Sequence, residues 1–488
     1  MKTTSGVVRG RTLHVLNKTV NQYLNIPYAE PPIGNLRFAP PVPLKQPLNY
    51  VINDTKRGKA CVQVGGNIAV SEDCLVLNIW TPNARNNNTN KSHLKPVMFW
   101  IYGGALVFGS INTYNGSFLA AHDVVFVAAN YRLGQLGFLY GDREDAPGNV
   151  GFYDQLLALK WVRENIHLFG GDRNQITIFG ESAGSWSVSA HILSPLSKGL
   201  FKRAIMQSGW SVSAHILSPL SKGLFKRAIM QSGSVFLGKL METITKSEAL
   251  VMAKNTAKQL NCSECKDWLQ CLRGVDAIEF LKIQPEFMLP VIDKSFALIS
   301  AQKAFQSKQF YSDIDLMVGV TRDEGSLLTE WFMGHIHNIT VDRFKQCVNK
   351  SETLGVRGID VDKVTDFYLK GVNTTDETAL QWAFYRYAGD VLMNCPTYLF
   401  GQQFARNVAQ NDGNVYFYEF TYANSDMSQV IGCDQETMGI CHAIDIFYVF
   451  GIPYLMPAFF TAEDFVFSLS YYDCVLSKQT GQQLAKFN

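Results

Sequence analysis

Residues 169–184 read FGGDRNQITIFGESAG, and this stretch decides the fold. Its middle part, Gln175 to Gly180, is rich in apolar and β-branched residues, which is typical of a strand buried on both faces. The strand leads directly into Gly-Glu-Ser-Ala-Gly at 180–184, and a helix-forming segment follows. Glycines on both sides of a serine permit the sharp strand-to-helix turn called a nucleophile elbow. The stretch therefore predicts an α/β fold with Ser182 exposed at the carboxyl end of a strand.

Strands of the same kind recur on either side of this stretch. Short apolar, β-branched runs occur at 97–104, 124–132, 315–320 and 415–420. Between the second run and the elbow, apolar residues from Phe152 to Ile166 are spaced three and four apart, as on an amphipathic helix. Alternating strands and helices predict a mostly parallel sheet with helices on both faces.

The overall composition excludes several classes of protein. A chain of 488 residues with 47% hydrophobic and 18% charged residues can bury a large core. The net charge of +2, without a block of Lys or Arg, excludes a nucleic-acid partner. The most apolar stretch, 444–460, is interrupted by Asp445, Pro453 and Pro457, so we expect core and no transmembrane segment. No Pro/Ser-rich linker divides the chain, and we expect one domain over residues 1–488.

Residues 186–209 and 210–233 are identical, which makes a 24-residue tandem duplication at 186–233. A repeat protein needs three or more units, and its end copies diverge. Two perfect copies in an otherwise unrepeated chain indicate an insertion into a fold that has room for one. The helix after the elbow must come from the first copy, but either copy could supply the next strand. Use of the second would leave about residues 195–218 looped out, exposing Leu200, Phe201, Ile205 and Met206 at a cost in stability.

The longer patterns around these motifs resemble those of type B carboxylesterases, the family of cholinesterases and of the non-catalytic neuroligins. Residues 169–184 are similar to its serine active-site signature. EDCLVLNIWTP at 72–82 is similar to its second signature, with Val76 where an aromatic residue or threonine is usual. The similarity extends to FTAED at 460–464 and implies an α/β-hydrolase fold with a large, mostly parallel central sheet flanked by helices. Relative to the family, we expect the chain to lack a signal peptide and the C-terminal end.

A serine alcohol is a weak nucleophile and needs a base, which in turn needs an orienting acid. The resemblance implies that the acid is Glu324, in GVTRDEGS, and that the base is His442, in MGICHAIDIFYVFG. The chain order Ser, Glu, His is that of α/β-hydrolases. Without the family, both assignments stay open. An acid beside Arg322 is more often an ion-pair partner, and nine histidines offer rival bases.

The resemblance also implies an oxyanion hole, made by backbone N–H groups that stabilise the negative charge of the transition state. The glycine-rich turn IYGGALVFG supplies Gly103, Gly104 and Ala105, and the residue after the serine supplies Ala183. Most family members have a third glycine where this chain has Ala105. A positive φ at an alanine costs on the order of 1 kcal/mol, so we expect a hole that is intact but narrowed.

The residues around the expected site favour a small-molecule substrate, namely a neutral carboxylic ester. We expect the reaction to need no cofactor and no metal. In acetylcholinesterases, a tryptophan in the first disulfide loop stacks on the choline cation. The corresponding loop, Cys61 to Cys74, has none, so choline esters are the alternative. The substrate pocket is expected to include Glu181, Trp331, Phe332 and Phe236.

Ten cysteines and nine Asn-X-Ser/Thr sequons point to a secreted, disulfide-bonded glycoprotein, against the alternative of a cytosolic protein with free thiols. The resemblance pairs Cys61 with Cys74 and Cys262 with Cys271. Cys433 and Cys441 could bridge just before His442. The pairing of Cys265, Cys347, Cys395 and Cys474 stays open, as does the oligomeric state. The sequons begin at Asn17, Asn53, Asn87, Asn90, Asn115, Asn261, Asn338, Asn349 and Asn373.

Two ion pairs of the family are also implied, Arg37 with Glu72 and Arg132 with Asp172, both in structural roles.

Three hypotheses about the function follow from the sequence. The first is a serine carboxylic ester hydrolase that works through an acyl-enzyme. The second is a non-catalytic, neuroligin-like adhesion or binding protein. The third is an inactive product of an esterase, damaged by the duplication and by truncation.

Overall fold

In a computed structural model, contacts between Cα atoms divide the chain into two compact units. Unit 1 comprises Met1–Ile205 and Thr243–Leu298, and unit 2 comprises Met206–Glu242 and Ile299–Asn488. The single domain expected from the sequence stays a prediction, and each unit is described by itself. The structure describes residues 1–53, 58–64, 69–82, 94–207, 227–232, 245–283, 290–291, 315–334, 336, 338–351, 358–408 and 414–470.

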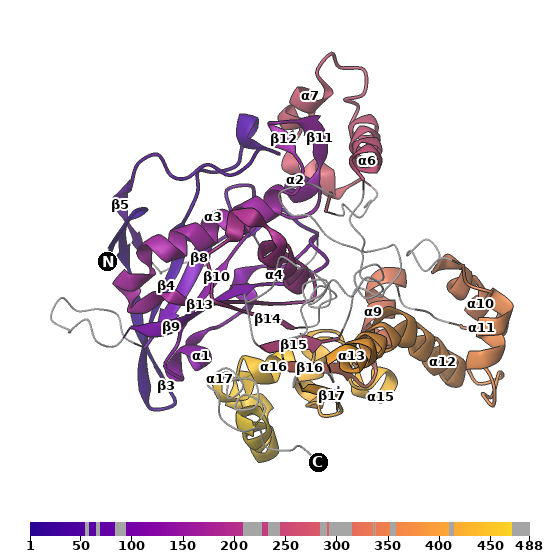
Figure 1. Ribbon diagram of the computed structural model, residues 1–488. Helices are drawn as coiled ribbons and strands as arrows, with labels where there is room; N and C mark the ends of the chain where they lie inside the picture. The colour runs from indigo at the N-terminus through magenta and orange to yellow at the C-terminus, as the bar shows by residue number, and fades with distance from the viewer. Residues whose placement is uncertain are drawn as a thin grey trace. The chain divides into compact units, whose positions relative to one another are not determined.

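The main sheet of unit 1 is mixed (Figure 1). Strands β13, β9 and β10 pair in parallel, and Phe99 of β9 lies between Ile178 of β13 and Val127 of β10. The pairs of β10 with β8, of β8 with β4 and of β4 with β3 are antiparallel. The bounds are Gly171–Glu181 (β13), Lys95–Ile101 (β9), Val125–Ala129 (β10), Val76–Thr81 (β8), Lys18–Pro27 (β4) and Arg11–Val15 (β3).

The central strands of this sheet have an almost entirely apolar sequence because they are buried. All five residues of β10 are buried, as are the last five of β9. The ring of Trp100 packs 4.8 Å from that of Phe179, centroid to centroid, and Phe179 also contacts Phe126. Burying side chains of this size contributes about 1.5 to 3 kcal/mol each. The predicted strands at 97–104, 124–132 and 175–180 therefore form the core of unit 1.

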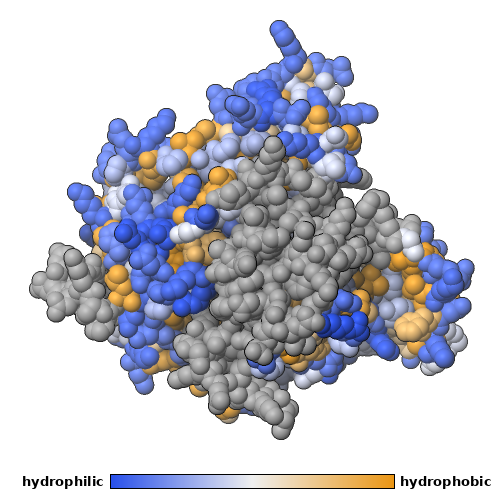
Figure 2. Space-filling view, in the orientation of Figure 1, coloured by the Kyte–Doolittle hydropathy of each residue, from blue (hydrophilic) through white to orange (hydrophobic). Residues whose placement is uncertain are grey.

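Helices cover the sheet as the strand–helix alternation predicted. Helix α3 (Val150–Asn165) carries the apolar stripe, and with α4 (Ala183–Leu193) it packs on β13. Helix α1 (Ser117–Ala121) packs on β4, β8 and β10. On the face drawn in Figure 2, the described residues of unit 1 are mainly hydrophilic, with small apolar patches among them. The layers are those of an α/β protein.

The rest of unit 1 forms smaller elements. Helix α6 begins at a capping box, in which Thr245 and Glu248 exchange hydrogen bonds, and it packs against α7 and β11. Two small sheets have the orders β1-β2-β5 and β6-β7. The bounds are Lys246–Gln259 (α6), Trp268–Gly274 (α7), Gly134–Phe138 (α2), Tyr140–Arg143 (β11), Ala146–Pro147 (β12), Lys2–Thr3 (β1), Gly6–Arg9 (β2), Leu48–Asn53 (β5), Ala60–Cys61 (β6) and Val70–Ser71 (β7).

The strands of unit 2 are parallel. Strand β15 (Arg227–Gln231) pairs with β16 (Asp315–Thr321), which pairs with β17 (Val415–Phe420). The expectation that β17 is buried is wrong in part, because Tyr416 is 45% and Phe417 48% exposed. Among the described residues, β17 pairs with β16 alone and stands at the end of the strand order.

Both copies of the duplication supply a strand. Strand β14 (Arg203–Gln207) comes from the first copy and β15 from the second, and they pair in parallel with Met206 opposite Met230. The expectation that one copy would be looped out from about residue 195 is therefore wrong, because the first copy continues into a paired strand. Leu200 and Phe201, expected to be exposed, are half-buried. Residues 208–226 lie outside the described residues.

In unit 2, helices α10, α11 and α12 share a core around Phe344, Phe384 and Tyr387. Helix α9 packs on α12, and α13 packs on β16 and β17. The apolar stretch after β17 forms the short helices α16 and α17. No described helix is both long and apolar enough to cross a bilayer. The bounds are Glu324–Met333 (α9), Val341–Lys350 (α10), Val361–Tyr368 (α11), Glu377–Gly389 (α12), Cys395–Val408 (α13), Ser425–Val430 (α14), Gln435–Met438 (α15), Ile446–Val449 (α16) and Ile452–Leu455 (α17).

Candidate active site

Ser182 lies at a strained turn between β13 and α4, with φ 50° and ψ −122°. The two neighbouring glycines make this turn possible. A Cβ atom at Gly184 would lie 2.0 Å from the carbonyl oxygen of Ile101, and one at Gly180 would lie 2.5 Å from the same atom. A non-glycine residue held in such a conformation costs of order 1 to 3 kcal/mol, and such residues cluster at functional sites. The sequence prediction of a nucleophile elbow agrees with this geometry.

The glycine-rich turn after β9 lies against the elbow, and both belong to unit 1. A Cβ atom at Gly103 would lie 2.6 Å from the carbonyl oxygen of Glu181 and 3.0 Å from the Cβ atom of Ser182. The turn is left-handed at Gly104 (φ 106°) and stays so at Ala105 (φ 52°). Ala105 therefore has the positive φ whose energetic cost was considered from the sequence. Ala183, the third expected donor residue, is buried as the first residue of α4.

Glu181 is buried beside the elbow, with only 5% of its surface exposed. Its carboxylate lies against the glycine-rich turn, because a Cβ atom at Gly103 would lie 2.6 Å from Oε2. Burial, and after it the negative charge of Glu181, raises the pKa of Tyr114. Glu181 is thus a buried acid next to both the elbow and the glycine-rich turn.

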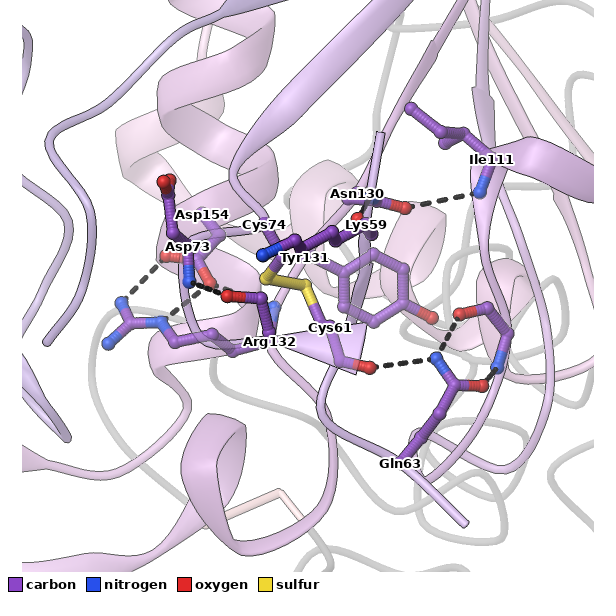
Figure 3. Close-up of a disulfide and its surroundings, with 12 residues drawn as sticks. Lys59, Cys61, Gln63, Asp73, Cys74, Ile111, Asn130, Tyr131, Arg132 and Asp154 are labelled. Atoms are coloured by element: carbon purple, nitrogen blue, oxygen red, sulfur yellow. Dashed lines mark hydrogen bonds and ion pairs between the residues drawn. A yellow bond between two sulfur atoms is a disulfide. The ribbon is translucent and has the colours of Figure 1, made fainter. Parts of the chain in front are cut away.

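A disulfide loop is tied to the glycine-rich turn by Gln63, a residue that sequence reasoning missed (Figure 3). Cys61 and Cys74 form the disulfide. The side chain of Gln63 donates to the carbonyl oxygen of Gly109 at 2.8 Å and accepts from its N–H at 2.8 Å. The same amide donates to the carbonyl oxygen of Cys61 at 2.9 Å. One glutamine therefore joins the Cys61–Cys74 loop to the end of the turn.

The two implied ion pairs differ in outcome. Arg37 pairs with Glu72 at 2.6 Å, as implied. Arg132 pairs with Asp154 of α3 at 2.7 Å, and the pairing with Asp172 is wrong (Figure 3). Both Arg132 and Asp154 are buried, and a buried guanidinium requires a buried carboxylate. Asp172 is partly exposed at the start of β13, where it accepts the N–H of Asn174.

Glu324 and His442 meet in unit 2. The Oε2 atom of Glu324 lies 2.7 Å from Nδ1 of His442, and both side chains are buried. The other carboxylate oxygen accepts the N–H of Thr321 at 2.7 Å, which fixes the orientation of the carboxylate. An imidazole whose Nδ1–H donates to a carboxylate presents Nε2 as the basic nitrogen.

The expected pocket residues are placed unequally. Trp331 lies on α9 with 45% of its surface exposed, and its ring meets that of His442 edge-on at 6.3 Å. Phe332 follows it on the same helix. Phe236 lies outside the described residues. Of the expected pocket, the structure therefore brings one aromatic ring against the imidazole of unit 2, and Glu181 against the elbow of unit 1.

The remaining cysteines complete the covalent framework. Cys262 pairs with Cys271, as the resemblance implied, and Cys433 with Cys441, directly before His442. Within the described part of the chain, Cys265, Cys347 and Cys395 are free thiols, and Cys474 lies outside it. Over the same residues, no group of three or more His, Cys, Asp or Glu side chains is arranged to hold a metal ion.

The alternation of strands and helices and the serine elbow define the class of the protein, an α/β-hydrolase. The model of the carboxylesterase family matches residues 1–211 and 209–477, and the two matches meet at the junction of the duplicated copies. The chain belongs to the carboxylesterase family.

Relatives support this assignment over nearly the whole chain. An acetylcholinesterase of Bungarus fasciatus is 32% identical over 491 residues, which cover 93% of this chain and 73% of the relative. A cholinesterase of Mus musculus is 32% identical over 507 residues, covering 96% of this chain and 76% of the relative. Membership of this family supports an esterase-type function.

Proposed function

We propose that the protein is a serine carboxylic ester hydrolase that uses Ser182, His442 and Glu324 and passes through an acyl-enzyme. The observation that carries the proposal is the buried contact of 2.7 Å between Glu324 and His442. The strained elbow at Ser182 supports the nucleophile. We also propose that the units form one α/β-hydrolase domain over residues 1–488, with a large, mostly parallel central sheet.

The proposed reaction has two halves. In the first, Oγ of Ser182 attacks the ester carbonyl carbon while Nε2 of His442 takes the hydroxyl proton. The tetrahedral intermediate collapses, the C–O bond to the alcohol breaks, and His442 returns the proton to the leaving alkoxide. In the second, His442 takes a proton from water, whose oxygen attacks the acyl carbon. The bond between that carbon and Oγ of Ser182 then breaks, the acid leaves, and His442 returns the proton to Oγ. Glu324 holds the imidazole in one tautomer and stabilises the imidazolium in both halves.

The negative charge of each tetrahedral intermediate is assigned to three backbone donors, the N–H groups of Gly104, Ala105 and Ala183. Donors of this kind act in the transition state, and the loss of one costs about 3 to 4 kcal/mol of activation free energy. The contact of the glycine-rich turn with the elbow supports the assignment.

The proposed substrates are neutral carboxylic esters. The loop between Cys61 and Cys74 contains no tryptophan to stack on a quaternary ammonium group. Choline esters are the second candidate, because both relatives are named cholinesterases. Trp331 is proposed to line the pocket with Phe332 and Phe236, and Glu181 to add negative potential.

We further propose that the protein is a secreted glycoprotein. The structure has three disulfides among the described residues, which are typical of oxidising compartments. The asparagines of seven sequons are described, and all are exposed; they are Asn17, Asn53, Asn115, Asn261, Asn338, Asn349 and Asn373.

A fluorophosphonate probe tests the proposed function. It reacts with an activated serine and leaves an adduct that mass spectrometry can place. We expect labelling at Ser182 and hydrolysis of p-nitrophenyl acetate, both abolished in Ser182→Ala. Absence of both in the folded parent would reject catalysis. A variant without residues 210–233 then tests the third hypothesis, since regained labelling indicates an esterase that the duplication had damaged.

A further inference from the structure

The segment that carries His442 lacks regular secondary structure. It follows α15, which ends at Met438, and precedes α16, which begins at Ile446. The backbone is left-handed at Gly439 (φ 71°) and again at Ala443 (φ 69°), on either side of the histidine. Because no helix or strand ladder fixes these residues, the position of His442 depends on contacts made from outside the segment.

Asp323 makes two of these contacts with one residue. Its N–H donates to the carbonyl oxygen of Ile440 at 3.0 Å, and its Oδ2 atom accepts the N–H of Ile440 at 2.8 Å. Both backbone polar groups of Ile440 are therefore held by Asp323, two residues before His442. The next residue in the chain, Glu324, binds His442 itself at 2.7 Å. Two adjacent acids thus hold two nearby points of the same segment.

The fit of Asp323 to the segment is close. A Cβ atom at Gly439 would lie 2.1 Å from Oδ2 of Asp323, so only glycine allows the carboxylate to reach Ile440. Arg322 donates to the same Oδ2 atom at 2.9 Å from the solvent side. Ser326 donates to the carbonyl oxygen of Asp323 at 2.8 Å. Asp323 is therefore fixed in the orientation that binds Ile440.

A disulfide supplies a second point of attachment. Cys441, between Ile440 and His442, is bonded to Cys433, and both residues are fully buried. They pack with Leu327, Met438 and Tyr385 in one apolar cluster. The disulfide joins the segment to the turn after α14, whereas Asp323 joins it to the acid-bearing turn after β16. The contacts of Asp323 hold the segment against the turn that carries Glu324, and Ser326 adds a hydrogen bond of 3.5 Å to Sγ of Cys441.

We propose that Asp323 is a positioning residue that holds the segment 439–443 so that the Nδ1 atom of His442 stays on the carboxylate of Glu324. The proposal deepens the proposed function and rests on it. Asp323 acts on the proposed base through Ile440 and touches no substrate. Catalytic groups must be held within about 0.5 Å of their working geometry, which one imidazole–carboxylate hydrogen bond does not ensure.

Three variants test the proposal through kcat and KM for p-nitrophenyl acetate. Asp323→Ala removes the acceptor, and we expect kcat to fall about 100-fold, as for a misplacement of about 1 Å, with KM changed less than twofold. Asp323→Asn keeps an oxygen that can accept from Ile440, and we expect kcat to recover to within about fivefold of the parent. Asp342→Ala removes an exposed acid of α10 and is the control, which should leave kcat within about twofold.

A second readout does not require activity. The Nδ1 proton of a histidine bonded to a carboxylate gives a far-downfield proton resonance. We expect that resonance, and slow exchange of the Ile440 amide, in the parent and in Asp323→Asn, and the loss of both in a folded Asp323→Ala. Retention of both in Asp323→Ala, or an unchanged kcat, overturns the positioning role. A parent that shows the resonance but no labelling at Ser182 overturns the proposed function alone.

Discussion

Glu324 binds the backbone on one side and an imidazole on the other. One carboxylate oxygen accepts from Thr321 and the second lies 2.7 Å from Nδ1 of His442, with all three residues buried. The carboxylate therefore cannot rotate without losing a hydrogen bond in a site where lost hydrogen bonds are costly.

Glu324→Gln is expected to lower kcat by about 10³- to 10⁴-fold with little change in KM, because an amide does not hold the imidazole in the productive tautomer. Steady-state kinetics with p-nitrophenyl acetate measure both constants. Glu330→Gln is the matched control on the same helix, where the carboxylate accepts from Tyr385. A Glu324→Gln enzyme within tenfold of the parent would exclude this residue as the acid.

Ala105→Gly is expected to raise turnover of esters with bulky acyl groups. Ala105 has a φ of 52°, which glycine adopts without strain, and the substitution removes a Cβ atom from the proposed oxyanion turn. Comparing kcat/KM for acetate and benzoate esters measures the effect. Equal or better turnover of benzoate by the parent would contradict the prediction.

His191 is expected to make the protein less stable in acid. Burial lowers its pKa to about 3, and its ring nitrogens contact Ser197 and Gln155 at 2.9 and 3.0 Å. Between pH 6.5 and about 3, the unfolded state binds the proton and the folded state does not. This contribution to stability is complete above pH 6.5 and is lost as the pH falls towards 3, by up to about 1.4 kcal/mol per pH unit.

Urea unfolding at several pH values tests this dependence. His191→Gln should flatten the slope of unfolding free energy against pH over that window, and His14→Gln, at an exposed position, controls for the removal of a histidine. Identical slopes in the parent and in His191→Gln would assign the acid sensitivity to other groups.

Asn373 is expected to carry an N-linked glycan when the protein is made in the secretory pathway. Its Oδ1 atom accepts from both the N–H and the hydroxyl of Thr375, and all residues of this sequon are exposed. Mass spectrometry after enzymatic deglycosylation in heavy-oxygen water would locate the glycan. Thr375→Ser should preserve the modification and Thr375→Ala should abolish it. An unmodified Asn373 in secreted protein would be the contrary result.

Deletion of residues 210–233 is expected to raise Tm. The shortened chain keeps β14, which has the same five residues as β15 and can offer β16 the same parallel register. The variant also has fewer residues to order on folding. Differential scanning calorimetry measures Tm, and a fall relative to the parent would indicate that the second strand contributes more stability than its insertion costs.

The strongly patterned parts of the chain could be predicted from the sequence. The sequence segments that form β9, β10, β13 and β16 are apolar because the sheet buries them, so burial can be recognised from their local composition. The turn at Ser182 could also be predicted, because it requires glycine at two positions where a Cβ atom would meet the carbonyl oxygen of Ile101, and the sequence shows both glycines.

Features that depend on partners distant in the sequence could not be predicted in this way. Arg132 selects Asp154 over Asp172 because of burial, and the only sequence signal was an acid within the apolar stripe of α3. The hydrogen bonds between Asp323 and Ile440 join residues more than a hundred positions apart in the sequence. The one sequence feature that pointed to Asp323 was its position next to Glu324. The exposure of β17 follows from its place at the end of a strand order, which its apolar composition does not reveal.

The pairing of β14 with β15 has a consequence for the route of folding. Since Arg203–Gln207 and Arg227–Gln231 are the same pentapeptide, their side chains give β16 no means of distinguishing one from the other. Only the connections of the chain then determine which of the two strands pairs with β16, and during folding β14 can pair with β16 before β15 does. Refolding should then follow two routes, one direct and one through an intermediate in which β14 is paired with β16. In the second route, that pairing must break before β15 can take its place.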